Sequence, residues 1–115
     1  RQNNPAIVGV DVLAGTIKSG IELMKDNGKP ITTVKSMQME KESVNKAEKG
    51  KQLAVSLDKV TVGRQINEDD VLFSAIPEVQ FRKFKEHKNL LSHDEMEILK
   101  EIAEIMRKQT PMWGV

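Results

Sequence analysis

The chain has 115 residues, of which 38% are hydrophobic and 30% charged, and its 18 Lys and Arg side chains nearly balance 17 Asp and Glu. This length fits one compact domain, or a smaller core with an appendage, and the small net charge excludes a global polycation for nucleic acid while leaving room for a local basic patch. The lack of cysteine excludes disulfides, thiolate metal sites and a cysteine nucleophile. No apolar run approaches the roughly 20 residues that span a membrane, so we expect a cytoplasmic protein. Because the chain begins with Arg1, we expect it to be a piece of a longer one.

The first part of the chain carries the patterns of short strands. Val8, Val10 and Val12 alternate with small or charged residues, which predicts a half-buried strand. Glycines flank residues 16–19, which predicts that this strand turns back there as a hairpin.

A second hairpin is predicted at Asn27 and Gly28, a pair that tolerates positive φ, between apolar runs at residues 21–24 and 31–39. Within the second run, Val34 and Met37 are three residues apart. They cannot share one face of a strand unless a bulge lies between them.

Further strands follow a polar stretch. Residues 41–49 contain little that is apolar besides Val44, so we expect a loop there. Residues 52–57 alternate cleanly, and residues 60–63 and 71–74 are shorter strand candidates. Short strands without an intervening helix pattern predict a mainly β fold, an antiparallel β-barrel or sandwich. The closed barrel is favoured because it leaves few exposed edges.

The composition changes at Pro77, beyond which glycine is absent until Gly114 and helix-forming residues dominate. We therefore predict a β-barrel over residues 1–76 and a C-terminal α-helical hairpin and tail over residues 77–115.

The two helices are expected at about residues 77–88 and 93–108. Ser92 and Glu95 have the spacing of a capping box at the start of the second helix. Its apolar stripe is wide enough to need more than one neighbour, so one side should pack and the other could form a groove for a partner. The partner-binding candidates on the pair are Phe81, Phe84, Leu99, Ile102 and Met106. We expect Trp113 to fold back onto apolar surface.

No pattern of catalytic residues is present. No phosphate-binding glycine loop occurs, and His87 and His93 lack partners at metal-ligand spacing. The Glu68-Asp69-Asp70 run is better explained as a solvated turn than as a cation site. We therefore expect no enzymatic activity, no metal site and no cofactor in this chain.

Several cations in the β part could contact phosphates. These are Lys18, Lys35, Lys41, Lys46, Lys49, Lys51 and Arg64. Because aromatic residues make up only 3% of the chain, contact with the backbone of a structured RNA is favoured over stacking on bases.

The order of several short motifs carries a resemblance to a known family. They are the Val8 to Gly20 stretch, Gly63-Arg64-Gln65-Ile66, Asp69-Asp70-Val71-Leu72, the leucine pair before Ser92, and Pro111-Met112-Trp113-Gly114-Val115. Together they resemble the C-terminal domain (domain IV) of archaeal and eukaryotic translation initiation factor 5B, a relative of bacterial initiation factor 2. The likeness covers essentially the whole chain.

This resemblance implies a barrel of the translational-GTPase domain II type followed by two helices, remote from a GTPase domain that would hold GTP and Mg²⁺ outside this chain. The intact factor would promote joining of the ribosomal subunits. The terminal helices would dock the C-terminal segment of initiation factor 1A. The barrel would contact the methionylated acceptor end of initiator tRNA through Gln38, Lys41, Gly50, Lys51 and Gln52. The alternative is a structural or ribosome-docking barrel that the helices merely cap.

Overall fold

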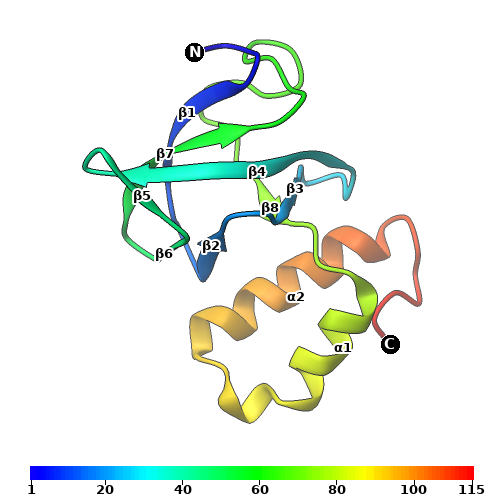
Figure 1. Cartoon of the computed structure of the whole chain (residues 1–115). Helices are drawn as coiled ribbons and strands as arrows, with labels where there is room; N and C mark the ends of the chain where they lie inside the picture. Colours follow the sequence, from blue (N-terminus) through cyan, green and yellow to red (C-terminus); the bar gives the residue numbers. More distant parts are fainter.

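Strands and helices occupy separate parts of the chain in the computed structural model, which describes residues 1–115 (Figure 1). The strands are β1 (Ala6–Asp11), β2 (Thr16–Lys18), β3 (Glu22–Met24), β4 (Pro30–Met39), β5 (Glu42–Val44), β6 (Lys46–Glu48), β7 (Gln52–Leu57) and β8 (Phe73–Ser74). The helices are α1 (Glu78–Glu86), the 3₁₀ turn η1 (Lys88–Leu90) and α2 (His93–Arg107).

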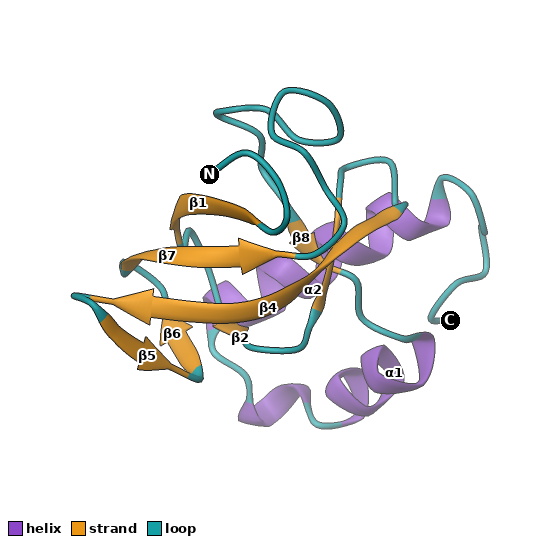
Figure 2. Ribbon diagram, turned by 45° about the horizontal axis from the view of Figure 1, so that its top comes forward, coloured by secondary structure: helices purple, strands orange, loops and turns teal.

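All strand pairs are antiparallel, and they form two sheets. The larger has the order β1-β7-β4-β3-β8, with β5 also paired to β4, and the smaller pairs β2 with β6. The predicted mainly β fold with two terminal helices is confirmed, but the sheets do not close into a barrel. β1 and β8 remain the edges of the larger sheet (Figure 2). Because β8 has only two residues and the segment before it consists of turns, no strand is available to join these edges.

Several strand predictions were wrong because the partner of a strand is not visible locally. β1 pairs with β7 and β2 with β6, so the predicted hairpin between residues 8–12 and 16–19 does not form. The predicted loop at residues 41–49 contains β5 and β6. Residues 60–63 form no strand, and the candidate at 71–74 is reduced to β8.

The irregularity expected in β4 is a β-bulge. Opposite β7, Val34 pairs with Leu57 and Ser36 pairs with Ser56, so Lys35 is the additional residue. Val34 is 0% exposed and Met37 is 2% exposed, which places both in the core. The bulge resolves the mismatch between their three-residue spacing and the two-residue period of a strand.

Two apolar clusters stabilise the molecule. One lies within the β part and includes Val34, Met37 and Val55. The other joins the helices to the sheet, because Met24 of β3 packs with Phe81 of α1 and Ile102 of α2. α2 runs beneath the sheets, and α1 packs on the side of α2 away from them (Figure 1).

The start of α2 has the predicted capping box. The Ser92 hydroxyl accepts the Glu95 backbone N–H at 3.1 Å, and the Glu95 carboxylate accepts the Ser92 N–H at 2.9 Å. These bonds satisfy amides that the first turn of a helix leaves free. The residue at which α2 begins is therefore set by local sequence.

Candidate binding groove and nucleic-acid interface

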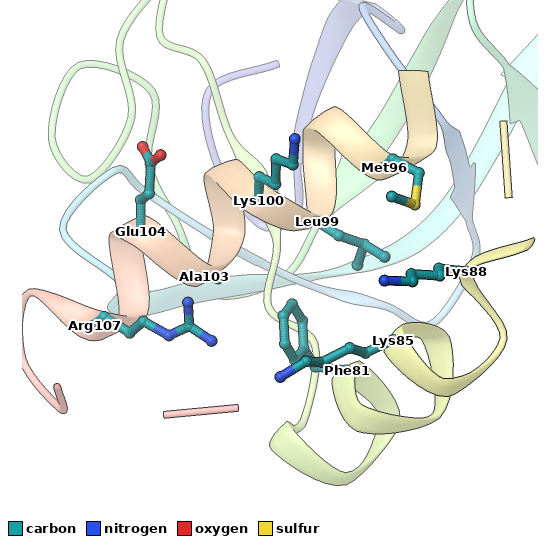
Figure 3. A pocket seen from close by; sticks show the side chains of 9 residues that line it. All are labelled: Phe81, Lys85, Lys88, Met96, Leu99, Lys100, Ala103, Glu104 and Arg107. Atoms are coloured by element: carbon teal, nitrogen blue, oxygen red, sulfur yellow. The ribbon is translucent and has the colours of Figure 1, made fainter. Parts of the chain in front are cut away.

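A groove of about 300 Å³ lies between α1 and α2. Its lining residues are Phe81, Lys85, Lys88, Met96, Leu99, Lys100, Ala103, Glu104 and Arg107 (Figure 3). Phe81 and Leu99 point into the space between the helices from opposite sides, whereas Lys100 and Glu104 point away from α1 (Figure 3). The groove therefore has an apolar centre and a charged border.

The aromatic wall of the groove is fixed by the end of the chain. The Phe81 and Trp113 rings pack with their centroids 4.7 Å apart, and the Arg107 guanidinium carbon lies 6.0 Å from the Phe81 centroid. The Arg107 Nε–H donates to the Trp113 carbonyl at 2.7 Å. Trp113 is only 7% exposed, which confirms that it folds back onto apolar surface.

Cations dominate the border of the groove. Lys85, Lys88 and Arg107 surround the gap between the helices (Figure 3), and none of them belongs to any of the four ion pairs in the chain. The Lys85 ammonium donates to the Gly114 carbonyl at 3.2 Å, which places it without neutralising it. The groove is therefore suited to an apolar segment that also carries negative charge.

The structure brings only some of the predicted partner-binding residues together. Phe81 and Leu99 line the groove. Ile102 is 0% exposed in the cluster beneath it, and Met106 packs toward the β3–β4 turn, where its sulfur would lie 3.4 Å from a Cβ at Gly28. Phe84 is half-buried outside the groove lining. The contact of any of these residues with a partner stays a prediction.

Sequence reasoning missed the cations of the groove, although their spacing contains a signal. On α2, Leu99, Ala103 and Arg107 follow one another at intervals of four residues, and on α1 Lys85 follows Phe81 at the same interval. Residues four apart lie on one face of a helix. The sequence therefore contained enough information to place Lys85 and Arg107 on the same helix faces as the apolar residues of the groove.

The predicted RNA-contacting residues gather at one end of the larger sheet. Gln38 of β4 lies opposite Ala54 of β7, and Gln52 lies two residues before Ala54 on β7, so the side chains of Gln38 and Gln52 share a face. Lys41 occupies the turn after β4, and Gly50 and Lys51 occupy the turn before β7. All five residues are exposed, as contact with RNA requires.

An ion pair connects this end of the sheet to the helices. The Lys49 ammonium donates a hydrogen bond to the Asp94 carboxylate at the start of α2. That bond and the adjacent positive charge hold the pKa of Asp94 below its ordinary value. Both side chains are about half exposed, so the pair is weak, but it connects the turn before β7 to the start of α2.

The chain contains no group of three or more His, Asp or Glu side chains that could hold a metal ion. His87 follows α1 and His93 begins α2, and both are exposed. None of its helices has the length and apolar character needed to cross a membrane.

Comparison with known proteins identifies the family. The family profile "Elongation factor Tu domain 4" matches residues 1–73, which is more than half of the chain. The chain belongs to this family.

This domain 4 chain is similar to archaeal initiation factors. It is 46% identical over 116 residues to "Probable translation initiation factor IF-2" of Methanopyrus kandleri, matching 100% of this chain and 19% of that protein. The protein of the same name from Hyperthermus butylicus is 45% identical over 120 residues, again with 100% and 19% coverage. The domain 4 chain thus spans about a fifth of the length of these relatives.

A solved structure supports the same relation. The "Crystal structure of GDP-bound aIF5B from Aeropyrum pernix" aligns with a TM-score of 0.92 and 35% identity, over 99% of the domain 4 chain and 19% of the other. The expected relation to the C-terminal domain of archaeal initiation factor 5B is confirmed.

Proposed function

We propose that this domain is a binding module of a translation initiation factor that promotes joining of the ribosomal subunits. The groove between α1 and α2 docks the C-terminal segment of initiation factor 1A. The end of the larger sheet at Gly50 contacts the acceptor end of initiator methionyl-tRNA. GTP and Mg²⁺ are held by a GTPase domain outside this chain.

The groove is the observation that carries this proposal. Its centre exposes part of Leu99 and Met96 to solvent, whereas the apolar residues beneath, such as Ile102, are fully buried. A half-buried apolar centre bordered by unpaired cations suits a short segment with apolar anchors and carboxylates. If the two helices only covered the sheet, they would need no half-buried apolar groove on the side away from it.

The groove is tested by exchanging one apolar side chain for an amide, once in the groove on α2 and once outside the groove on α1. Leu99→Gln removes an apolar contact in the groove, whereas Val79→Gln acts on an α1 residue that is 63% exposed and does not line the groove. The ligand is a fluorescein-labelled peptide of the initiation factor 1A C-terminal segment. We expect roughly tenfold weaker binding for Leu99→Gln and no change for Val79→Gln. Equal affinities would reject the groove.

The tRNA contact rests on the exposed polar and basic side chains at the Gly50 end of the sheet. Lys41→Glu and Lys51→Glu should each weaken binding of initiator methionyl-tRNA about tenfold at low salt, because each replaces a phosphate-neutralising charge. Lys29→Glu is the control, since Lys29 is also exposed but lies in the turn at the other end of β4. If all three variants bind equally, this surface does not contact tRNA.

The alternative of a capped structural domain is favoured by one observation. Met24 of the sheet is 1% exposed in the cluster formed with the helices, so the helices cover apolar surface of the β part. This alternative predicts that truncation before Pro77 unfolds the strands, while charge reversal at Lys41 or Lys51 leaves tRNA affinity unchanged.

A further inference from the structure

The two-stranded sheet of β2 and β6 places two lysines directly opposite each other. Its register pairs Thr16 with Glu48, Ile17 with Ala47, and Lys18 with Lys46. Because side chains alternate along a strand, Lys18 and Lys46 share one face with the first pair. Ala47 is 3% exposed and Ile17 packs against the core, so the lysine face is the outer one.

The hydrogen bonds around these strands show that the lysines form a close pair. Ser19 donates to the Asn45 carbonyl and Lys49 donates to the Gly15 carbonyl, both at 3.0 Å. The hydrogen-bonded positions of this antiparallel pair are therefore the odd-numbered ones. Lys18 and Lys46 occupy the non-hydrogen-bonded position between them, where facing side chains approach most closely.

No carboxylate compensates this pair. The four ion pairs of the chain involve other cations, and the Glu48 carboxylate on the same face lies beyond 4.0 Å of either ammonium. Like charges directly opposite each other destabilise a sheet. Two facing lysines without a counter-ion are therefore available to an external anion.

We propose that the outer face of the β2–β6 ribbon binds the phosphodiester backbone of RNA through Lys18 and Lys46. All four side chains on this face are polar or charged, so a protein partner would find no apolar anchor there. A phosphate backbone needs only cations and hydrogen-bond donors. Lys46 is also four residues before Gly50, so the ribbon leads into the surface proposed for tRNA contact.

This inference rests on the proposed contact of the domain with RNA. It adds the β2–β6 ribbon as a second RNA-binding surface, separate from the one at Gly50. Binding by the ribbon would be independent of RNA sequence, because lysines that contact phosphates position an RNA without distinguishing its bases. Its contribution should be dependent on salt and similar for different RNA duplexes.

The test uses charge reversal, because stability and RNA affinity should then change in opposite directions. Lys18→Glu replaces the like-charge pair by an opposite-charge pair, so the midpoint of thermal unfolding should rise by about 1–4 °C. Affinity of the 115-residue chain for a fluorescein-labelled RNA duplex should fall roughly fivefold at low salt, and the slope of log K against log[salt] should decrease by about one. Lys29→Glu is the control and should change neither quantity.

A double variant separates structure from binding. Lys18→Glu with Lys46→Glu restores a like-charge pair, so thermal stability should fall again while RNA affinity falls further. Lys51→Glu, measured in parallel, reports on the surface proposed for tRNA, so failure of either surface can be recognised separately.

Three outcomes would overturn the ribbon proposal. The first is a Lys18→Glu affinity equal to that of Lys29→Glu. The second is no measurable RNA binding by the unaltered chain, which would overturn the tRNA surface as well. The third is loss of affinity for a poly-glutamate peptide without loss for RNA, which would assign the lysines to an acidic protein partner.

Discussion

Gly114 occupies a backbone position that few other residues could adopt. Its φ is +72°, and a Cβ there would lie 2.7 Å from two carbons of the Phe81 ring. Its N–H donates to the Glu78 carboxylate at 2.6 Å, and its carbonyl accepts from Lys85. The glycine thus lets the end of the chain approach the Phe81 ring closely.

We predict that Gly114→Ala destabilises the chain by about 2–4 kcal/mol, because it combines strain at positive φ with a collision against a packed ring. Gly63→Ala is the matched control, since Gly63 has a φ of +95° but nothing within 4 Å of an added Cβ. It should lose only about 1 kcal/mol. Urea unfolding followed by fluorescence of Trp113, the only tryptophan, measures both. Equal losses would show that Phe81 does not confine this position.

Among the elements, β4 contains one extra residue, Lys35, at its bulge. The bulge turns the strand so that Val34 and Met37 both enter the core, and the side chain of Lys35 is exposed. Deletion of Lys35 should leave Val34 and Met37 two residues apart, so the ordinary period of a strand keeps both on the core face and the pairs with β7 continue without a bulge.

The deletion should therefore cost less than about 2 kcal/mol, as measured by urea unfolding, since the register with β7 is kept and only the local twist of the bulge is lost. Lys35→Ala keeps the bulge and should stay within about 0.5 kcal/mol of the unaltered chain. A deletion variant that loses about 3 kcal/mol or more, or does not fold, would show that the fold needs the bulge itself and not only the inward placement of Val34 and Met37.

The contact between the β6–β7 turn and α2 should be visible in the titration of Asp94. Because Lys49 lowers the pKa of Asp94, the stabilisation from this pair is present above the ordinary carboxyl pKa and is lost as pH falls through the lowered value. In Lys49→Gln, the pKa of Asp94 should return upward, as followed by NMR of its carboxyl carbon. The control is Lys46→Gln in β6, the strand just before Lys49, and it should leave the pKa of Asp94 unchanged. An unaltered pKa in Lys49→Gln would show that the two residues do not pair in solution.

At the scale of the whole molecule, local signals predicted local structure. The capping box at Ser92, the turn at Gly28 and the need for a bulge after Val34 each depend on neighbouring residues, and all three were confirmed. Strand partners could not be predicted, because the pairing of β1 with β7 joins residues far apart in sequence. β5 and β6 were missed because three-residue strands with one apolar side chain each show no period.

The candidate groove was predictable only in part, for a related reason. The apolar stripe of α2 and the aromatic residues of α1 indicated that the helices face each other. Which residues of the α2 stripe become buried depends on how the two helices pack against the sheet. Ile102 and Met106 lie on the side of α2 that faces the sheet. Arg107 joins the groove through its bond to Trp113, a contact that only the folded tail creates.

The central claim is that the groove between α1 and α2 receives a segment of initiation factor 1A. The most direct measurement is NMR of the isotope-labelled chain during titration with the C-terminal segment of that factor. We predict saturable shift changes in the signals of Phe81, Met96, Leu99 and their neighbours, with small changes in the strands. Changes confined to the strands, or no saturable changes at millimolar peptide, would contradict the claim.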